Sequence, residues 1–388
     1  MRCPAFVCAT CVVTLAHAQT EPSWAWETQT QSPIAVSAAE LTDQELELQR
    51  ACGTSEAGLR RVAKKLVERK ALELPYLDTE ALSFALRASG EPHVWPHAWI
   101  VSARALDQDS LVTKLTVWRR SFQDSGLRRC GVATGYSQDG TRVVAAVALD
   151  ALADLTVALP TTTHVGTWLT IDARVNVPAT GARVVVVGPG GEPHNVPSSF
   201  DGARIVARFA PDRVGAFTVQ VVIDAATGPR PSLMAQVFAD EPPPTSIPNL
   251  SAPFEAAGAN LSDERLALLA MLSALRADQR LVALARDARL DGLALAHARR
   301  MMQAHVVGHD VGDGDPSQRL QSAGLSAQQV SENVAHAQTV TLAHRALWFS
   351  PSHRANMLRA EVTQIGVAVV DDPDGSVWVA EVFARDLR

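Results

Sequence analysis

The stretch SENVAHAQTVTLAHRALWFSPSHRANML, residues 331–358, decides the fold of the last part of the chain. It opens with the pair Glu332-Asn333, continues with an apolar run that carries Trp348, and ends in a segment that contains His353. Side chains able to bind metals or donate hydrogen bonds rarely gather in a half-apolar segment unless they face a common site. We therefore expect a functional site here and work outward from it.

The residues around this stretch predict helices packed on a small sheet. Apolar residues at helical spacing predict helices over 266–275, 287–304 and 342–349. The apolar segments 366–370 and 377–383 flank Asp374-Gly375, a pair typical of a hairpin turn. The chain should therefore close on an antiparallel hairpin.

A chain of 388 residues is too long for one ordinary core, and its composition changes along its length. We predict a signal peptide at 1–18, an α+β domain at 39–150, a β-sandwich at 153–240, a proline-rich linker at 241–258 and a last domain at 259–388. The central segment alternates apolar and polar residues with a period of two, as in 169–175, which indicates an immunoglobulin-like sandwich. It has no cluster of ionisable residues, so a spacer or adhesion role is expected for it.

The N-terminus has the pattern of an export signal. Arg2 precedes an apolar run over 4–15, and Ala16-His17-Ala18 fits a cleavage site after Ala18. This run is shorter than the ~20 residues that a membrane-spanning helix needs. We expect a secreted, periplasmic or extracellular protein with no transmembrane segment after cleavage. The net charge of −6 does not indicate nucleic-acid binding.

Removal of the signal would leave Cys52 and Cys130 out of five cysteines. A remaining pair in an oxidising compartment is a candidate disulfide, although two buried thiols are the alternative. The same domain has a capping box at Thr42 and Glu45, and helices are predicted near 59–66 and 78–87. A hairpin is predicted over 130–148.

An internal repeat links the first and last domains. CGVATGYSQDGTRVVAAVA, from Cys130, aligns without gaps to IGVAVVDDPDGSVWVAEVF, from Ile365. Hairpins with Asp-Gly turns are common, so the likeness has a simple alternative explanation. Since both segments follow helices and end their domains, we expect the first domain to be a degenerate copy that keeps the scaffold and lacks the site.

The last domain resembles the CAP family of cysteine-rich secretory proteins, antigen 5 and pathogenesis-related 1 proteins, whose domain is also called SCP. The segments that carry the resemblance, in the family's order, are 272–276, 287–301, 309, 319–324, 332–335, 348–356 and 363–367. The resemblance implies an α-β-α sandwich with a cleft lined by His309, Glu332 and His353.

The resemblance is to the short bacterial type, because Phe349-Ser350-Pro351 follows Trp348 where other members carry a second site Glu. Glu381 and Asp310 are the carboxylates that could substitute. Neither stands at the family's position, which leaves the usual set of two His and two Glu incomplete.

The chemistry of these residues allows a metal site or a hydrogen-bonded polar core. His309 and His353 are candidate zinc ligands, with Glu332 orienting an imidazole or acting on a bound water. In the alternative, these groups fix the loop geometry. His297 is expected to be a partnered core residue, and Ser350 and Ser352 are expected to cap the short helix that follows them.

The leading prediction for function is a CAP-domain module that binds a small-molecule, lipid or envelope ligand, with His309, Glu332 and His353 at the site. The first alternative is a metal-assisted, peptidase-like hydrolase with Glu332 as base and zinc as cofactor. The second is a purely structural extracellular protein.

Overall fold

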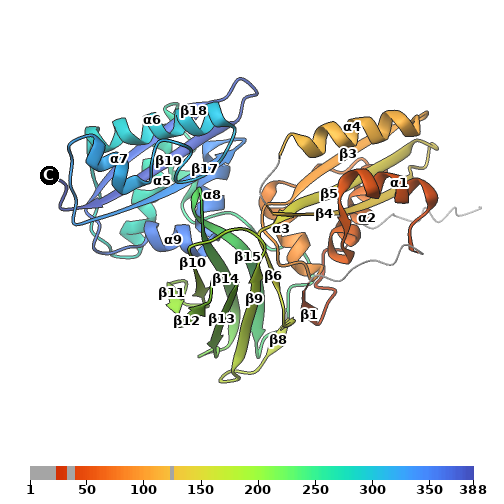
Figure 1. Ribbon diagram of the computed structural model, residues 1–388, viewed down its shortest axis with the longest axis horizontal. Helices are drawn as coiled ribbons and strands as arrows, with labels where there is room; N and C mark the ends of the chain where they lie inside the picture. The colour runs from red at the N-terminus through yellow and green to blue at the C-terminus, as the bar shows by residue number, and fades with distance from the viewer. Residues whose placement is uncertain (1–22, 33–39, 123–125) are drawn as a thin grey trace, which may run out of the picture.

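The structure is a computed structural model that describes residues 23–32, 40–122 and 126–388. Two α/β units lie side by side above a β-sandwich, in a multidomain arrangement (Figure 1). The expected signal peptide at 1–18 lies outside the described residues. None of the helices within the described ranges is long and apolar enough to cross a membrane.

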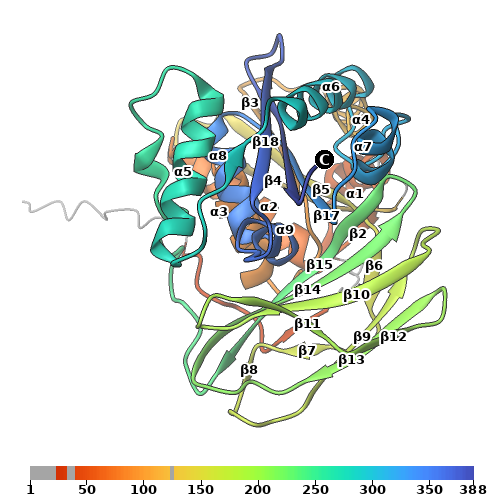
Figure 2. The ribbon, with the colours of Figure 1, turned by 90° about the vertical axis from the view of Figure 1, so that its left-hand side faces the viewer.

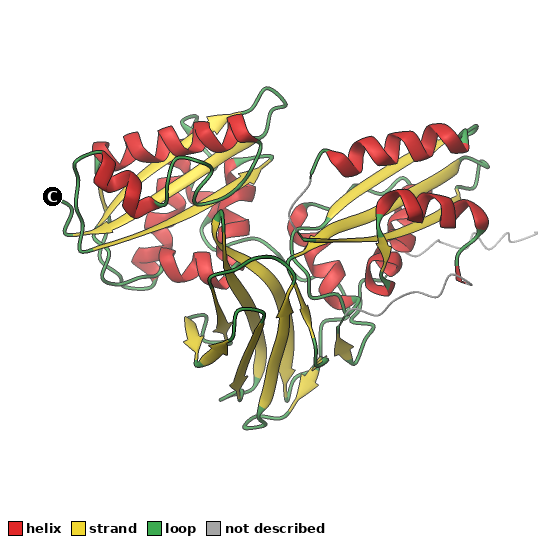
Figure 3. Ribbon diagram, viewed as in Figure 1, coloured by secondary structure: helices red, strands yellow, loops and turns green. Residues whose placement is uncertain are grey.

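The C-terminal unit, residues 264–385, places a sheet between two layers of helices (Figure 3). Its helices are α5 (Glu264–Asp278), α6 (Ala288–Ala304), α7 (Pro316–Ser322), α8 (Val340–Phe349) and α9 (Pro351–Met357). Its strands are β16 (Ala285–Arg286), β17 (Gln329–Ala337), β18 (Gln364–Asp371) and β19 (Val377–Arg385). The predicted helices and closing hairpin are confirmed.

The sheet of the C-terminal unit has the strand order β16-β18-β19-β17, with β16 parallel to β18 and the other pairs antiparallel. Its two faces bury separate cores. Val367 and Val379 pack with α5, α8 and α9, whereas Ala368 and Ala380 pack with α6 and α7. This alternation follows from the opposite directions of successive side chains in a strand. The strand order places β17 at an edge of the sheet.

The N-terminal unit, residues 43–151, repeats this architecture. Its helices are α1 (Asp43–Cys52), α2 (Ala57–Ala71), α3 (Thr79–Ala88) and α4 (Gln108–Arg120). Its strands are β2 (Thr54–Ser55), β3 (His97–Ala103), β4 (Leu127–Tyr136) and β5 (Arg142–Ala151), in the order β2-β4-β5-β3. The capping box at Thr42 and the predicted hairpin are present.

The two units share strand directions and register. β2 runs parallel to β4 as β16 runs parallel to β18, and the remaining pairs are antiparallel in both. Cys130 pairs with Ala148, and Ile365 pairs with Phe383, which are the positions matched by the gapless alignment.

A glycine marks the same close contact in both units. A Cβ on Gly131 would lie 2.1 Å from Arg60 N of α2, and one on Gly366 would lie 2.1 Å from Leu290 C of α6. The two helices therefore approach their sheets at matching points, where only glycine leaves room for the helix backbone.

The disulfide expected from the cysteine count is present. Cys52, at the end of α1, bonds to Cys130 in β4, with the two Cα atoms 5.8 Å apart. The bond joins the outer helix layer of the N-terminal unit to its sheet.

The central sandwich consists of two sheets around one apolar core. One sheet has the order β11-β10-β14-β15-β8 and the other β12-β13-β9-β6. The strands are β6 (Ala153–Leu155), β8 (Thr162–Thr163), β9 (Leu169–Val175), β10 (Gly181–Val187), β11 (Pro193–Val196), β12 (Ser198–Phe200), β13 (Arg204–Phe209), β14 (Gly215–Ala225) and β15 (Gly228–Ala239). A separate pair joins β1 (Thr30–Gln31) to β7 (Leu159–Pro160).

The C-terminal unit rests on the sandwich through α9, which packs against β10, β11 and β14 (Figure 2). The two α/β units also touch each other. Arg345 of α8 forms an ion pair of 3.1 Å with Asp78, the N-cap of α3. The short 3-10 helix η2 (Glu255–Ala257) lies in the linker, and its Glu255 also pairs with Arg345.

Candidate functional site

Glu332 is the centre of a buried polar cluster on the edge strand β17. Its carboxylate is fully enclosed, and it bonds to His309 Nδ1 through Oε2 and to Arg319 Nη2 through Oε1. The Oε2 to Nδ1 distance is 2.9 Å. Burial raises the pKa of Glu332, but the hydrogen bond and charge of His309, with Arg319 and His297, outweigh it and bring the pKa below its ordinary value. Glu332 is therefore an ionised hydrogen-bond acceptor.

His309 lies in the loop between α6 and α7, and side chains from both helices form hydrogen bonds to this loop. Arg319 Nη1 donates to the His309 carbonyl at 2.7 Å. The buried His297 contacts Asp313 Oδ2 at 2.8 Å and the Gly308 carbonyl at 2.9 Å. The expectation that His297 is a partnered core residue is confirmed, and its role is to fix the loop that carries His309.

His353 enters the same cluster from α9. Its Nδ1 lies 2.8 Å from Ser350 Oγ. Desolvation lowers the pKa of His353 to about 3, helped by the positive charges of His309 and Arg183. The structure thus brings together His309, Glu332 and His353, which stand far apart in the sequence, and it keeps His353 neutral at ordinary pH.

Asparagine side chains attach α9 to the sheet. Asn356 Nδ2 donates to the Glu332 carbonyl at 3.1 Å and to Asn333 Oδ1 at 3.0 Å. Asn333 Nδ2 in turn donates to the His353 carbonyl at 3.3 Å. These bonds explain why an Asn follows the site Glu and another closes the α9 segment: they position the backbone that carries His353.

The prediction that Ser350 and Ser352 cap α9 is wrong for their side chains. Ser350 occupies the N-cap position, but its side chain makes no capping bond. Its hydroxyl instead contacts His353 Nδ1 and Gln220 Nε2 of β14. The buried amide of Gln220 also accepts from Ser352 N. Side chains from the sandwich therefore take part in the site.

The sandwich also covers His309. The carbonyl of Thr227, in the turn between β14 and β15, accepts from His309 N at 2.7 Å and from Asp310 N at 3.2 Å. A Cβ on the neighbouring Gly228, whose φ is +92°, would lie 2.7 Å from His309 Cβ. This contact contributes to the burial of His309, which is 8% exposed.

Neither carboxylate considered as the second site acid reaches the histidines. Asp310 Oδ1 accepts from Gly312 N and Gly314 N within its own loop. Glu381 is fully buried in β19, and its Oε2 accepts from Asn333 Nδ2 at 3.0 Å. Burial raises the pKa of Glu381 to about 7, against the smaller opposing effect of Asn333. Glu381 supports the asparagines beneath α9.

The cluster, as arranged, offers fewer free donor atoms than a zinc site needs. Catalytic zinc usually has three protein ligands, and both Glu332 oxygens are engaged by His309 and Arg319. Only the two imidazoles remain. In residues 23–32, 40–122 and 126–388, no group of three or more His, Cys, Asp or Glu side chains is placed to hold a metal ion.

Three contributors to the cluster had no assigned role in the sequence analysis. Arg319 stood in a matched segment. Because a buried carboxylate needs a charged partner, the prediction that Glu332 is buried could have led to a search for a nearby Arg. Gln220 and Thr227 gave no such signal, because nothing in a strand or turn indicates which distant helix it will meet.

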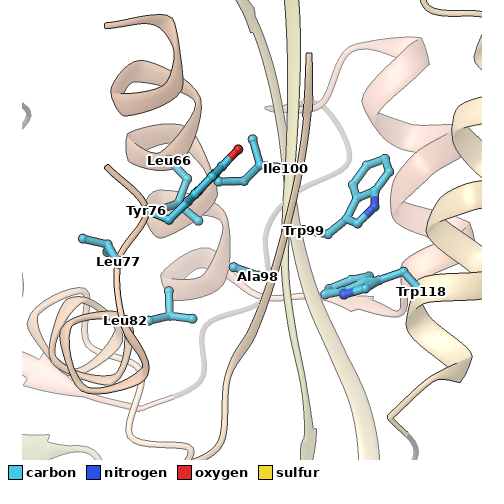
Figure 4. Close-up of a pocket in the computed structure, with 8 residues that line it drawn as sticks. All are labelled: Leu66, Tyr76, Leu77, Leu82, Ala98, Trp99, Ile100 and Trp118. Atoms are coloured by element: carbon cyan, nitrogen blue, oxygen red, sulfur yellow. The ribbon is translucent and has the colours of Figure 1, made fainter. Parts of the chain in front are cut away.

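Among the described residues of the N-terminal unit, apolar side chains occupy the positions on β3 and β5 that match the cluster. The shared register aligns Glu332 with Ala98, Asn333 with Trp99 and Glu381 with Ala146. At this edge the unit has a cavity of about 370 Å³. The cavity is lined by Leu66, Tyr76, Leu77, Leu82, Ala98, Trp99, Ile100 and Trp118, with the two tryptophans on one side of β3 (Figure 4).

Comparison with known proteins identifies the family of the C-terminal unit. Residues 269–382 match the family described as CAP, the cysteine-rich secretory protein family. The C-terminal unit is thus a CAP domain, as the sequence predicted, within a multidomain α/β chain. No curated protein matches the chain.

Several solved structures are similar to the chain at low identity. An outer surface protein from Borrelia burgdorferi is 19% identical, with 32% of this chain and 94% of that one covered and a TM-score of 0.30. An extracellular SCP-domain protein from Bacillus anthracis is 18% identical, with coverages of 49% and 67% and a TM-score of 0.30. A cysteine-rich secretory protein from Staphylococcus aureus is 10% identical, with coverages of 61% and 83% and a TM-score of 0.27.

Proposed function

We propose that this chain is an exported CAP-domain protein that uses His309, Glu332 and His353 to bind a small-molecule, lipid or envelope ligand. The observation that carries the proposal is the use of the imidazole nitrogens. Within the described contacts, each ring meets the protein through Nδ1. Both Nε2 atoms are then left for a ligand, and an imidazole nitrogen can form a hydrogen bond to it.

Ligand capture by the full chain tests this proposal. The protein is incubated with vesicles of bacterial envelope lipids and with envelope extract, and bound molecules are identified by mass spectrometry. We expect retention by the native chain and its loss in His353→Ala. His305→Asn is the matched control, because His305 is exposed in the same domain and Asn tolerates its left-handed backbone. Equal capture by native chain and His353→Ala would contradict the proposal.

A metal-assisted hydrolase is the less favoured alternative. A general base needs an oxygen facing the water it deprotonates, and both oxygens of Glu332 already accept hydrogen bonds. A hydrolase would show peptidase activity that chelation abolishes and zinc restores. Activity that survives Glu332→Gln would exclude Glu332 as the base.

Zinc binding by His309 and His353 stays a prediction, with weak affinity expected from a two-imidazole site. Isothermal titration of the full chain with zinc measures it directly. Binding that is unchanged in His309→Asn would remove these residues as ligands.

Export is proposed from the N-terminal signal pattern. Expression in a bacterial host with its secretion machinery should place the protein outside the cytoplasm with Gln19 as the first residue. Mass spectrometry of the N-terminal peptide measures the cleavage site, and an uncleaved cytoplasmic product would contradict it.

We further propose that the N-terminal unit is a degenerate CAP-like copy and that the immunoglobulin-like sandwich is a spacer between the copies. Support comes from the matched register and from Gly131 and Gly366 at equivalent contacts. In the capture assay, Trp99→Ala should then leave binding intact. A purely structural role for all three parts is favoured if neither ion nor ligand is retained by any form of the protein.

A further inference from the structure

The contacts of His353 continue through α9 into the sandwich. Ser350 Oγ lies 2.8 Å from His353 Nδ1 and 3.0 Å from Nε2 of Gln220. Gln220 is 1% exposed, so the Gln220 end of this chain of contacts is shielded from water. Gln220, which stands 130 positions before Ser350, therefore reaches the imidazole of His353 through the Ser350 hydroxyl.

The orientation of the Gln220 amide follows from its second contact. Ser352 N lies 2.9 Å from Gln220 Oε1. A backbone N–H can only donate, so the oxygen of the amide must face Ser352. The NH₂ group then faces Ser350 and can only donate to its hydroxyl.

This arrangement determines where the single proton of Ser350 goes. Its oxygen accepts from Gln220, and its proton has His353 Nδ1 at 2.8 Å or Ser352 Oγ at 3.4 Å as acceptors. Hydrogen bonds from hydroxyl groups are best near 2.8 Å and poor at the longer distance. Ser350 therefore donates to His353 Nδ1, and the neutral ring carries its proton on Nε2.

The neutral form of His309 has the opposite tautomer. Its Nδ1 faces the Glu332 carboxylate at 2.9 Å. An ionised carboxylate only accepts, so Nδ1 must carry the proton of the neutral ring. The Nε2 atom of His309 is then a bare acceptor, whereas that of His353 is a donor.

We propose that Gln220 is a positioning residue that sets the tautomer of His353, so that the cluster, with both rings neutral, offers one imidazole acceptor and one imidazole donor. Such a pair suits a ligand group that both donates and accepts, an alcohol hydroxyl being the simplest. The assignment of ligand class rests on the proposed binding function, but the assignment of the tautomer does not.

The test is a tautomer measurement on the full chain. Long-range ¹H–¹⁵N correlation at pH 8, with labelled histidine and His353 assigned by its absence in His353→Asn, shows which nitrogen is protonated. We expect protonated Nε2 in the native chain, with about a fivefold excess over the tautomer ratio of free histidine from one net hydrogen bond. A native ring protonated on Nδ1 would overturn the proposal.

Gln220→Glu should reverse the result. The carboxylate would still accept from Ser352 N but would now also accept the Ser350 proton, so that Ser350 accepts from His353 Nδ1–H. Gln236→Glu is the matched control, because Gln236 lies on the neighbouring strand β15 and contacts Gln31. An unchanged tautomer in Gln220→Glu would remove Gln220 from its assigned role.

Ser350→Ala provides an independent variant if Gln220→Glu does not fold. It removes the donor to Nδ1 and should return the tautomer ratio to that of free histidine, which abolishes the fivefold excess over that ratio. Retention of that excess would contradict the proposed route from Gln220 to His353.

The ligand class has its own test. Vesicles containing a long-chain alcohol are compared with vesicles containing its methyl ether, which lacks the donor. We expect the alcohol vesicles to be bound several-fold more tightly by the native chain. Equal binding, or none, would overturn the ligand class, and the tautomer measurement would still decide the role of Gln220.

Discussion

The two α/β units have the same strand order and register, but different residues occupy the edge that forms the site. In the C-terminal unit, Glu332 on the edge strand β17 collects His309 and Arg319 into a buried polar cluster. In the N-terminal unit, Ala98 and Trp99 occupy the equivalent edge on β3 and line a largely apolar cavity. The comparison teaches that this scaffold needs no particular chemistry at its edge, because the glycine contacts and the two cores on either face maintain it.

The largest expected difference between the units concerns the charged pair of the cluster. Arg319→Ala leaves Glu332 buried without one of its two hydrogen-bonded partners, and we expect a loss of about 4 kcal/mol in the stability of the C-terminal unit. Adding Glu332→Ala, which installs the residue type of the N-terminal unit, should recover part of this loss. Native-state hydrogen exchange measures each unit separately.

An exposed ion pair supplies the control for that experiment. Arg213 and Asp212 are both more than half exposed, so Arg213→Ala should have little effect on stability. If Arg319→Ala were equally mild, the cluster would not contribute the stability assigned to it.

The disulfide stabilises the N-terminal unit alone, whereas the charged cluster stabilises the C-terminal unit. Cys52 and Cys130 close a loop with a sequence separation of 78, whereas Ile365 stands at the position matched to Cys130. Reduction should lower the stability of the N-terminal unit by about 4 kcal/mol, since the unfolded chain regains loop entropy. Hydrogen exchange with and without reductant should show this change in β4 and β5, with β18 and β19 unaffected. An equal effect on both hairpins would contradict it.

The buried carboxyl of Glu381 should make the stability of the C-terminal unit depend on pH. Ala146, at the matching position of the N-terminal unit, has no titratable group and contributes no such dependence. The folded pKa of Glu381, about 7, lies above the ordinary value of 4.5. The folded state therefore holds the proton more tightly, and this contribution is complete below pH 4.5 and lost as the pH rises through 7. The expected loss is about 3 kcal/mol.

Chemical denaturation between pH 4.5 and 8, followed by hydrogen exchange in β18 and β19, measures this dependence. Glu381→Gln should reduce the slope of the unfolding free energy of the C-terminal unit against pH by the contribution of one proton. A slope that persists in this variant would assign the pH dependence to other groups.

The smallest expected effect is one that the two units share. A Cβ at Gly131 or Gly366 would meet the backbone of the facing helix, and we expect each Gly→Ala change to cost about 2 kcal/mol. Gly292→Ala is the control, because a Cβ there meets nothing within 4 Å and alanine favours the helix. Unequal costs at Gly131 and Gly366, measured by denaturation, would weaken the case for equivalent scaffolds.

Local patterns in the chain were enough to predict most secondary structure of the C-terminal unit. Helical spacing predicted α5, α6 and α8, and the Asp374-Gly375 turn predicted the last hairpin. The capping prediction for Ser350 failed because a hydroxyl can bond either to the helix backbone or to a nearby side chain, and a tertiary contact with Gln220 won.

The sequence by itself determined most elements of the C-terminal unit, the candidate cysteine pair, the motif order of the CAP domain and the hairpin of its last two strands. These depend on periodicity, turn chemistry and residue type, which act over a few positions along the chain. Only the tertiary structure decided that Arg319 neutralises Glu332, that Thr227 covers His309 and that Gln220 contacts Ser350. Those contacts depend on how whole surfaces pack, and the free energy of that packing is spread over many residues with no local periodic signal.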